Sequence, residues 1–521
     1  MNVFLMFPDR DFNPEQELPL HEASLIQDLE LKILLEAMAM GDDFLEKVAK
    51  QSILSTLDSP DLIRYRQDIL LDCLRNPEVV RQIYQIPIQS MINKRKNWMG
   101  IFNNYPTGIL SSARSLLEMF IGLLKNLRQI ADEHGQKFES TGFRRFFSMI
   151  QQELDDEYFA VVTQHLKKIK FQQGVLVSAE LGLGNEGTNY VLRTNDLENQ
   201  NWIERIVQRK VSGYSYTLHP RDDHGARALG DLRDRGVNLV ANAVAQSTDH
   251  IDSFFNALRT ELAFYIGCVN LSAQLTRLGQ PICFPIPQPA YKRRLAFSGL
   301  IDVALALTSK KKVVGNDLEA DNKDLIFITG ANQGGKSTYL RSIGQAQLMT
   351  QCGMFVAANS FSANLCKHLF THYKREEDAT MESGKFDEEL HRMSDIIDQI
   401  TPDSLVLFNE SFASTNDREG SEIARQILRA LQEKKIKVIF VTHLYELAHG
   451  FYEGKADYAL FLRAERKADG ERTFKIIPGK PMQTSFGVDV YHDVFDVDSQ
   501  KIRAVDKSMV VMEDSTDDTQ Q

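Results

Sequence analysis

The sequence has few of the features that mark secreted, zinc-binding or membrane proteins. Its 521 residues include only five cysteines, an odd number, and none of them forms a CxxC pair. Such a scattered set predicts neither a disulfide framework nor a structural zinc site, and it favours a reducing compartment. No segment resembles a membrane span. The apolar start, residues 1–7, is too short and lacks the basic lead of a signal peptide. We therefore expect a cytoplasmic protein without a membrane partner.

An excess of positive charge is also missing. The formal net charge is −11, which excludes a uniformly basic surface and leaves only local patches for contacts with nucleic-acid phosphates. The candidate patches are 94–96, 167–170, 310–312 and the arginine-rich stretch 221–235. The last of these also carries aspartates, and each patch taken alone fits a solvated helix face better than a binding surface.

The spacing of apolar residues predicts a helical domain followed by an α/β domain. In most of 20–170, and again in 224–279, apolar residues recur at three- and four-residue intervals, as in helices. The segment 171–218 between them has the composition of strands and predicts a small β insertion. Four prolines within 281–289 indicate a rigid connection. We predict a helical domain over 1–280, an α/β domain over 281–500 and a disordered acidic tail over 501–521.

Two features of the first domain need an interpretation. An apolar stripe in the second helical stretch is expected to pack against the α/β domain, with partner binding as the alternative. The stripe consists of Ile251, Phe254, Phe255, Leu258, Leu262, Tyr265 and Val269.

Residues 182–187 match GxGxxG, but a dinucleotide site needs a helix after the third glycine, and 188–192 has the composition of a strand. We predict a hairpin turn there.

A glycine-rich loop in the second domain carries the strongest functional signal. Residues 330–338 have the GxxxxGK[ST] pattern of a phosphate-binding loop, with a buried strand predicted over 325–329 and a helix over 339–349. Glycines let backbone N–H groups and the helix N-terminus face a polyphosphate. The predicted ATP-binding residues are Gly330, Ala331, Asn332, Gln333, Gly334, Gly335, Lys336, Ser337 and Thr338. Lys336 is expected to reach the β- and γ-phosphates, and Ser337 to bind Mg²⁺.

Two further predicted strands end in polar pairs. The apolar run 404–408 leads into Asn409 and Glu410, and 438–441 leads into Thr442 and His443. Open α/β sheets bind ligands at the carboxyl ends of their strands. At a Walker B strand an Asp normally holds Mg²⁺ through water, and the following Glu orients the attacking water. We predict a metal role for Asn409, which brings no charge, and catalytic roles for Glu410 as general base and His443 as γ-phosphate sensor. In the alternative, these residues begin loops and make ordinary hydrogen bonds.

The motifs and their spacing resemble one family, the MutS proteins of DNA mismatch repair. The usual loop of that family, Gly-Pro-Asn-Met-Gly-Gly-Lys-Ser-Thr, differs from this one only at Ala331 and Gln333. Similar segments follow at 353–358, 383–386, 410–415, 441–447 and 485–487. Two positions that are usually Gly in the family are Phe412 and Ser414 here. The agreement is strong over about 320–490 and weaker over the preceding helical region, where 61–84 is similar to the start of the family's lever and core.

The resemblance implies an α/β fold, namely a P-loop ABC-type ATPase domain with a mixed, mostly parallel sheet, preceded by a helical lever and core domain. It implies a homodimer with two shared ATP sites, in which Ser383 reaches in trans the γ-phosphate bound by the partner. ATP and Mg²⁺ are the implied ligands. DNA is the implied partner, held in a clamp that ATP gates during mismatch repair or a related repair or recombination process, with repair or recombination proteins as further partners.

Departures from the family pattern leave alternatives open. Because the resemblance begins almost at residue 1, we expect no N-terminal mismatch-reading domain. A clamp for branched or recombining DNA is therefore as well supported as a mismatch repair role. Asn409 also leaves open a nucleotide-gated protein scaffold with weak ATPase activity and no mismatch recognition. An ABC transporter subunit is disfavoured because the usual Leu-Ser-Gly-Gly-Gln signature is absent.

Overall fold

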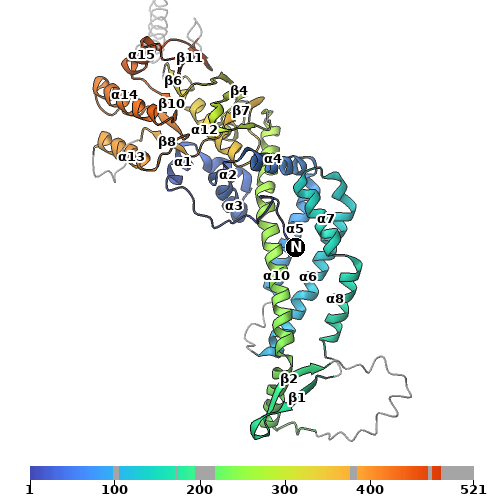
Figure 1. The fold of residues 1–521 in the computed structure, drawn as a ribbon. Coiled ribbons are helices and arrows are strands. Elements are labelled where there is room, and N and C mark those ends of the chain that lie inside the picture. Colours follow the sequence, from blue (N-terminus) through green and yellow to red (C-terminus); the bar gives the residue numbers. More distant parts are fainter. Residues whose placement is uncertain are drawn as a thin grey trace, which may run out of the picture. The chain divides into compact units, whose positions relative to one another are not determined.

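The fold is that of a mixed α/β protein, shown as a computed structural model in Figure 1. The structure describes residues 1–97, 105–171, 174–193, 217–331, 333–375, 384–466 and 472–482. The chain divides into two compact units, each discontinuous in sequence. The helical unit comprises Met1–Pro14 and Asp68–Ile266, and the sheet unit comprises Glu15–Gln67 and Gly267–Gln521. The sequence instead predicts one boundary near residue 280, and the predicted tail, 501–521, lies outside the described residues.

Helices with local start signals build the helical unit. Its main helices are α5 (Pro77–Asn97), α6 (Pro106–His134), α7 (Thr141–Glu153), α8 (Asp156–Lys168) and most of α10 (Asp223–Arg277). Pro106 opens α6 at a position where its missing N–H costs nothing. Ser140 and Asp155 cap α7 and α8 by accepting hydrogen bonds from the backbone N–H groups of Phe143 and Tyr158. The predicted helical character of this region is confirmed.

The apolar stripe on α10 packs differently from the prediction. Phe255 lies edge-on against Phe120 of α6, with their ring centroids 5.6 Å apart. Tyr265 donates its hydroxyl hydrogen to the Leu5 carbonyl at 2.6 Å. Both contacts lie inside the helical unit, so this part of the stripe forms the core of its own unit. The prediction of packing against the α/β domain was wrong for these residues, because periodicity identifies an apolar face but not its partner.

One helix contradicts the expectation that nothing resembles a membrane span. Within the described ranges, the segment 106–137, which is α6 and the 3-10 turn after it, is long and apolar enough to cross a membrane, judged by length and composition alone. Core helices of many globular proteins pass the same test. Here Phe120, Leu124 and Leu127 are fully buried, and α6 packs against α5, α7 and α8. This finding is therefore weak evidence for a membrane span.

The β insertion contains the predicted hairpin. Strand β1 (Leu176–Leu181) pairs antiparallel with β2 (Gly187–Arg193), and the GxGxxG residues form the turn between them. Gly184 has a φ of +74°, which glycine adopts without strain. The hairpin prediction is confirmed, and no helix follows the third glycine. Residues 172–173 and 194–216 of the predicted insertion lie outside the described residues.

The sheet unit contains a six-stranded sheet with the order β12-β11-β6-β10-β9-β8. All pairs are parallel except the β11–β12 edge pair. The strands are β6 (Leu325–Thr329), β8 (Leu369–Tyr373), β9 (Leu405–Asn409), β10 (Lys437–Val441), β11 (Ala459–Arg466) and β12 (Arg472–Pro478). β6 and β10 are buried along their whole length. Continuous apolar runs are typical of parallel strands covered on both faces, so the prediction of a mixed, mostly parallel sheet is confirmed.

Helices cover both faces of this sheet. On one face, α13 (Lys385–Gln399), α14 (Asp417–Glu433) and α15 (Tyr445–Glu453) bury Phe327, Phe408 and Phe440 in a common core. On the other face lies α12 (Lys336–Gln351), where a Cβ placed on Gly344 would meet the side chain of Leu407 at 2.8 Å. Figure 1 shows α12 to α15 around these strands.

Two smaller parts complete the sheet unit. A second sheet has the order β3-β7-β4-β5, with strands β3 (Ile286–Gln288), β4 (Leu295–Leu300), β5 (Asn316–Glu319) and β7 (Ser360–Asn364). The segment 15–67 adds α1 (Glu22–Asp28), α2 (Leu31–Ala39), α3 (Asp43–Leu54) and the start of α4 (Pro60–Arg75). Helix α2 packs against α11 (Val303–Ser309), and α3 packs against α12.

Candidate functional site

Strand register brings the predicted site residues to one edge of the six-stranded sheet. Val441 of β10 lies opposite Asn409 of β9 and opposite Ile328 of β6. The three parallel strands therefore end together, and the residues that follow them share one edge. This is the carboxyl edge, where the sequence analysis expected a ligand site.

The glycine-rich loop connects β6 to α12 at this edge. Gly330 and Gly335 have φ values of +123° and +87°, which side-chain-bearing residues rarely adopt. A Cβ on Gly330 would also lie 3.0 Å from the backbone nitrogen of Ala464. Helix α12 begins at Lys336, inside the motif, and its N-cap residue Gly335 has no side chain that could cap the first N–H groups of the helix. Asn332 lies outside the described residues.

Lys336 folds back over the loop. Its side chain is buried, with 4% exposed, and its ammonium group donates to the carbonyl oxygens of Gly330 at 3.0 Å and Ala331 at 2.9 Å. Burial lowers the pKa of Lys336, and the charge of Glu410 partly opposes this shift. A cation is thus held among loop carbonyls beside a helix N-terminus, where anions are stabilised.

Ser337 and Asn409 place two oxygen atoms side by side. The Ser337 hydroxyl donates to the Asn409 carboxamide oxygen at 3.0 Å. Oxygen ligands suit Mg²⁺, which keeps several waters and needs few protein ligands. In the part of the chain that the structure describes, no group of three or more His, Cys, Asp or Glu side chains could hold a metal by itself. The residues present therefore fit a Mg²⁺ ion bound jointly with substrate phosphates, and they do not fit a protein-only metal cage.

Glu410 and His443 form a pair at the ends of β9 and β10. The His443 Nε2 lies 2.7 Å from the Glu410 Oε1, and both side chains are partly exposed. The hydrogen bond from His443 is the main reason that the pKa of Glu410 lies below its usual value. A carboxylate ionised at neutral pH suits the orientation of a water molecule. The structure therefore gives His443 a partner, Glu410, that the sequence analysis did not foresee.

The turn after Glu410 depends on a residue that sequence reasoning did not assign to the site. Glu389 of α13 is buried, and its carboxylate accepts hydrogen bonds from the Phe412 N–H at 3.0 Å and the Ser414 hydroxyl at 3.1 Å. Phe412 has a φ of +62°, which explains physically why the MutS resemblance places Gly at this position. The available signal was the acidic pair 388–389 behind the segment 383–386. Ser383 itself lies outside the described residues.

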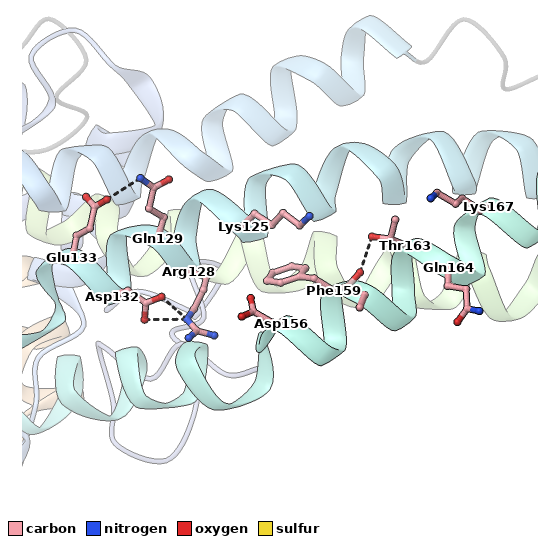
Figure 2. Close-up of a pocket in the computed structure, with 11 residues that line it drawn as sticks. Lys125, Arg128, Gln129, Asp132, Glu133, Asp156, Phe159, Thr163, Gln164 and Lys167 are labelled. Carbon is pink, nitrogen blue, oxygen red and sulfur yellow. Dashed lines mark hydrogen bonds and ion pairs between the residues drawn. The ribbon is translucent and has the colours of Figure 1, made fainter.

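A groove in the helical unit contains none of the predicted site residues. It has a volume of about 710 Å³ and lies between α6 and α8. Figure 2 shows an ion pair between Arg128 and Asp132 and a hydrogen bond from Gln129 to Glu133 in this groove. Arg128 pairs with Asp132 and donates to the Leu154 carbonyl, and the Lys125 ammonium lies 5.3 Å from the centre of the Phe159 ring. This groove gives no support to the predicted site.

The sheet unit is thus a mixed α/β domain with a glycine-rich loop at the carboxyl edge of its sheet, and comparison with known proteins identifies its family. Residues 58–278 match the family model described as MutS2 N-terminal domain, and residues 326–509 match MutS domain V. This chain belongs to the MutS family. The match of the helical region to MutS2 is a distinction that the sequence analysis did not make.

Individual relatives give the same family. A DNA mismatch repair protein MutS of Prochlorococcus marinus (strain AS9601) is 31% identical over 211 residues, which cover 40% of this chain and 23% of that protein. Its counterpart in Porphyromonas gingivalis (strain ATCC BAA-308 / W83) is 32% identical over 299 residues, 56% of this chain and 33% of the relative. The human MutS protein homolog 4 is 32% identical over 143 residues, with coverages of 27% and 15%. The chain thus spans about a third or less of the length of these relatives.

Proposed function

We propose that this protein binds ATP together with Mg²⁺ at the carboxyl edge of β6, β9 and β10, and hydrolyses it. The observation that carries the proposal is the convergence of three motifs that are distant in sequence. The loop with Lys336, the Ser337–Asn409 pair and the Glu410–His443 pair meet where parallel strands end. A P-loop ATPase site combines such a loop with a strand that ends in a metal-binding residue, normally Asp and here Asn409, and with a residue that orients the attacking water.

Each group has a role that its surroundings support. The loop N–H groups and Lys336 bind the phosphates, and Ser337 with Asn409 orients the shell of a Mg²⁺ ion. That ion neutralises charge on the phosphate oxygens when bound. Glu410, ionised and oriented by His443, holds the attacking water and accepts its proton. Ser383 acts in trans in a homodimer, as the family resemblance implies.

We further propose that ATP gates binding of the protein to DNA in a repair or recombination process. The matched relatives from bacteria carry the name DNA mismatch repair protein, and family membership supports this extension. With a net charge of −11, contact with DNA has to rely on local basic patches. Repair or recombination proteins are the further partners we propose, and the cytoplasm is the proposed location.

A second candidate function is a nucleotide-gated protein scaffold with weak hydrolysis. The uncharged Asn409 beside Ser337 favours it, because a carboxamide attracts Mg²⁺ less than a carboxylate does.

The steady-state Mg-ATPase rate separates the two functions when it is measured without DNA and with duplex, mismatched and four-way-junction DNA. Salt is held fixed at a low concentration because phosphate contacts are strongly screened. A rate that one DNA form changes supports the DNA-gated function, whereas a rate indifferent to all of them favours the scaffold.

Replacing Lys336 tests the nucleotide site directly. We expect Lys336→Ala to abolish ATP binding, because the variant loses the cation that faces the phosphates. Binding of a fluorescent ATP analogue measures the effect, and Lys434→Ala, an exposed lysine elsewhere in the sheet unit, is the matched control. ATP affinity that stays unchanged in Lys336→Ala would remove the loop from the proposed site.

Replacing Glu410 tests the catalytic assignment. We expect Glu410→Gln to bind ATP normally while its hydrolysis rate falls by roughly 100-fold or more, the usual range for loss of a general base. Filter binding and single-turnover hydrolysis measure the two quantities separately. Equal turnover by the variant and the wild type would contradict the assignment.

A further inference from the structure

The turn that presents Glu410 has an unfavourable backbone conformation. Glu410 and Phe412 have φ values of +55° and +62°, in the left-handed region that residues with a Cβ seldom adopt. Such residues persist only where neighbouring groups hold them in place. The direction of the Glu410 carboxylate therefore depends on whatever fixes residues 410–414.

Glu389 supplies the fixing contacts from α13. Its two carboxylate oxygens accept from the Phe412 backbone N–H at 3.0 Å and from the Ser414 hydroxyl at 3.1 Å. Burial raises the pKa of Glu389, while the bonds from Ser414 and Phe412 favour the ionised form and oppose this shift. Glu389 is 2% exposed, so water cannot replace it as an acceptor without a change in structure.

His372 of β8 ties the same turn to the backbone of α13. Its Nε2 lies 3.0 Å from the Glu389 carbonyl oxygen, which can only accept, so the ring proton is on Nε2. The Ser411 hydroxyl donates to the His372 carbonyl oxygen at 2.5 Å, and its oxygen lies 2.7 Å from Nδ1. Burial, with a contribution from the charge of Arg392, lowers the pKa of His372 to about 4. The imidazole is therefore neutral at physiological pH.

We propose that Glu389 is a positioning residue for Glu410, and that it links the orientation of the general base to the position of α13. The inference rests on the proposed ATPase function. Glu389 acts by fixing the main chain at Phe412 and the side chain at Ser414. His372 contacts both the Glu389 carbonyl oxygen and the Ser411 hydroxyl, and so holds α13 against the same turn. A displacement of α13 releases the turn and turns the Glu410 carboxylate away from its water.

Kinetics of the full-length chain test the proposal. We expect Glu389→Ala to lower the single-turnover hydrolysis rate about 30-fold while the Kd for ATP stays within about threefold, because the water is misplaced and the phosphate contacts are kept. Glu389→Gln should recover most of the rate, since its amide oxygen still accepts from Phe412. Glu388→Ala is the matched control, because Glu388 lies on the same helix and pairs with Arg392 instead.

A double variant distinguishes positioning from a purely structural role. If Glu389 acts through Glu410, Glu389→Ala should slow hydrolysis less than about threefold further in a Glu410→Gln background, because both changes remove the same contribution. Full additivity, parallel loss of ATP affinity and rate, or a wild-type rate in Glu389→Ala would each overturn the proposal. If Glu389→Ala fails to fold, Ser414→Ala takes its place in the same cycle, because it removes one of the two donors to Glu389. The same outcomes then support or overturn the proposal. A wild-type protein that does not hydrolyse ATP refutes the proposed function itself, whereas an active wild type with an equally active Glu389→Ala variant refutes only the positioning role.

Discussion

Asn409 occupies the position where a Walker B strand normally carries Asp. Its carboxamide oxygen lies 3.0 Å from the Ser337 hydroxyl oxygen. We predict that Asn409→Asp lowers the Mg²⁺ concentration for half-maximal ATP hydrolysis about tenfold, because a carboxylate attracts the hydrated cation. A Mg²⁺ titration of the rate measures this. Asn416→Asp adds the same charge at the N-cap of α14, where Asp caps equally well. Equal shifts in both variants would show a general charge effect instead.

Phe412 combines a buried ring with a left-handed backbone. The ring stacks on His372 with the centroids 5.3 Å apart, and the residue is 1% exposed. Both Phe412→Ala and Phe412→Gly lose the ring, at a cost of about 3–5 kcal/mol, but only Gly removes the backbone strain. We therefore predict that the Gly variant is more stable than the Ala variant by about 1 kcal/mol in urea unfolding.

The control for this comparison is a residue in ordinary helical conformation. Ala430→Gly on the exposed face of α14 should instead destabilise the protein by about 1 kcal/mol. The same order at both positions, with Ala more stable than Gly, would show that Phe412 carries no backbone strain.

The residues that could be predicted are those with a local motif. Lys336, Ser337, Glu410 and His443 each follow a strand with an apolar run, and strand ends in a parallel sheet meet at one edge. Glu389 and His372 have no such marker. Their roles depend on packing of α13 and β8 against the turn after β9, which a single sequence does not specify. The roles of all the predicted site residues remain predictions, and Asn332 and Ser383 also lie outside the described residues.

At the scale of elements, buried polar contacts anchor the helix that follows the glycine-rich loop. Arg341 of α12 pairs with Asp302 and with Glu30 between α1 and α2. Gln345, one turn later, accepts from the Val303 N–H at 2.9 Å and donates to the Leu29 carbonyl at 3.0 Å. The segment 15–67 therefore contributes directly to the position of the helix that carries Lys336 and Ser337.

We predict that Gln345→Leu destabilises the sheet unit by roughly 2–4 kcal/mol, since it leaves a buried donor and a buried acceptor unpaired. Urea unfolding of the full chain measures this loss. The matched control is Gln426→Leu on the exposed face of α14, where we expect a change within about 0.5 kcal/mol. A loss of the same size in both variants would mean that the Gln345 contacts contribute little.

Element length decided which elements the sequence could predict. The apolar runs of β6, β9 and β10 were predicted because they are uninterrupted and flanked by turn residues. The second sheet was not, because β3 has three residues and β5 has four, with exposed and buried positions mixed. A pattern that short does not distinguish a strand from a loop.

At the scale of the whole molecule, one buried carboxyl group holds the first residues of the chain in the helical unit. Glu261 of α10 is fully buried and accepts from the N–H groups of Leu5 at 2.6 Å, Met6 at 3.0 Å and Phe12 at 2.8 Å. Burial raises the pKa of Glu261 from 4.5 to about 7, although the three N–H groups oppose the shift. The folded protein therefore binds more protons than the unfolded chain between these two pH values.

This linkage predicts a pH-dependent stability of the helical unit. The contribution of Glu261 is complete below about pH 4.5 and is lost as the pH rises through about 7, a change of about 3 kcal/mol. Glu261→Gln should flatten this part of the curve of unfolding free energy against pH. Glu157→Gln, an exposed change on α8, should leave the curve unchanged. A Glu261→Gln variant with the wild-type slope would assign the pH dependence to other groups.

Domain organisation was the feature least accessible from the sequence. Composition predicted one boundary near residue 280, because periodicity and proline content vary only along the chain. The compact units instead alternate along it, with 15–67 grouped with residues that begin at 267. The contacts responsible, such as Asn270 with the Met38 carbonyl at 2.9 Å and Gln274 with the Ala37 carbonyl at 2.7 Å, join segments that only tertiary structure brings together.

This alternation has a consequence for the order of events during synthesis. Helices α1 to α3 leave the ribosome roughly 200 residues before the first of their partners in the sheet unit. At about 5–20 residues per second, that interval is about 10–40 s. Leu31, Leu34 and Leu35, all buried in the folded unit, have no native partners from 267 onward during this time. The apolar residues of this segment therefore lack part of their native packing for many seconds in the nascent chain. The sheet unit can complete its folding only after the helical unit has been synthesised.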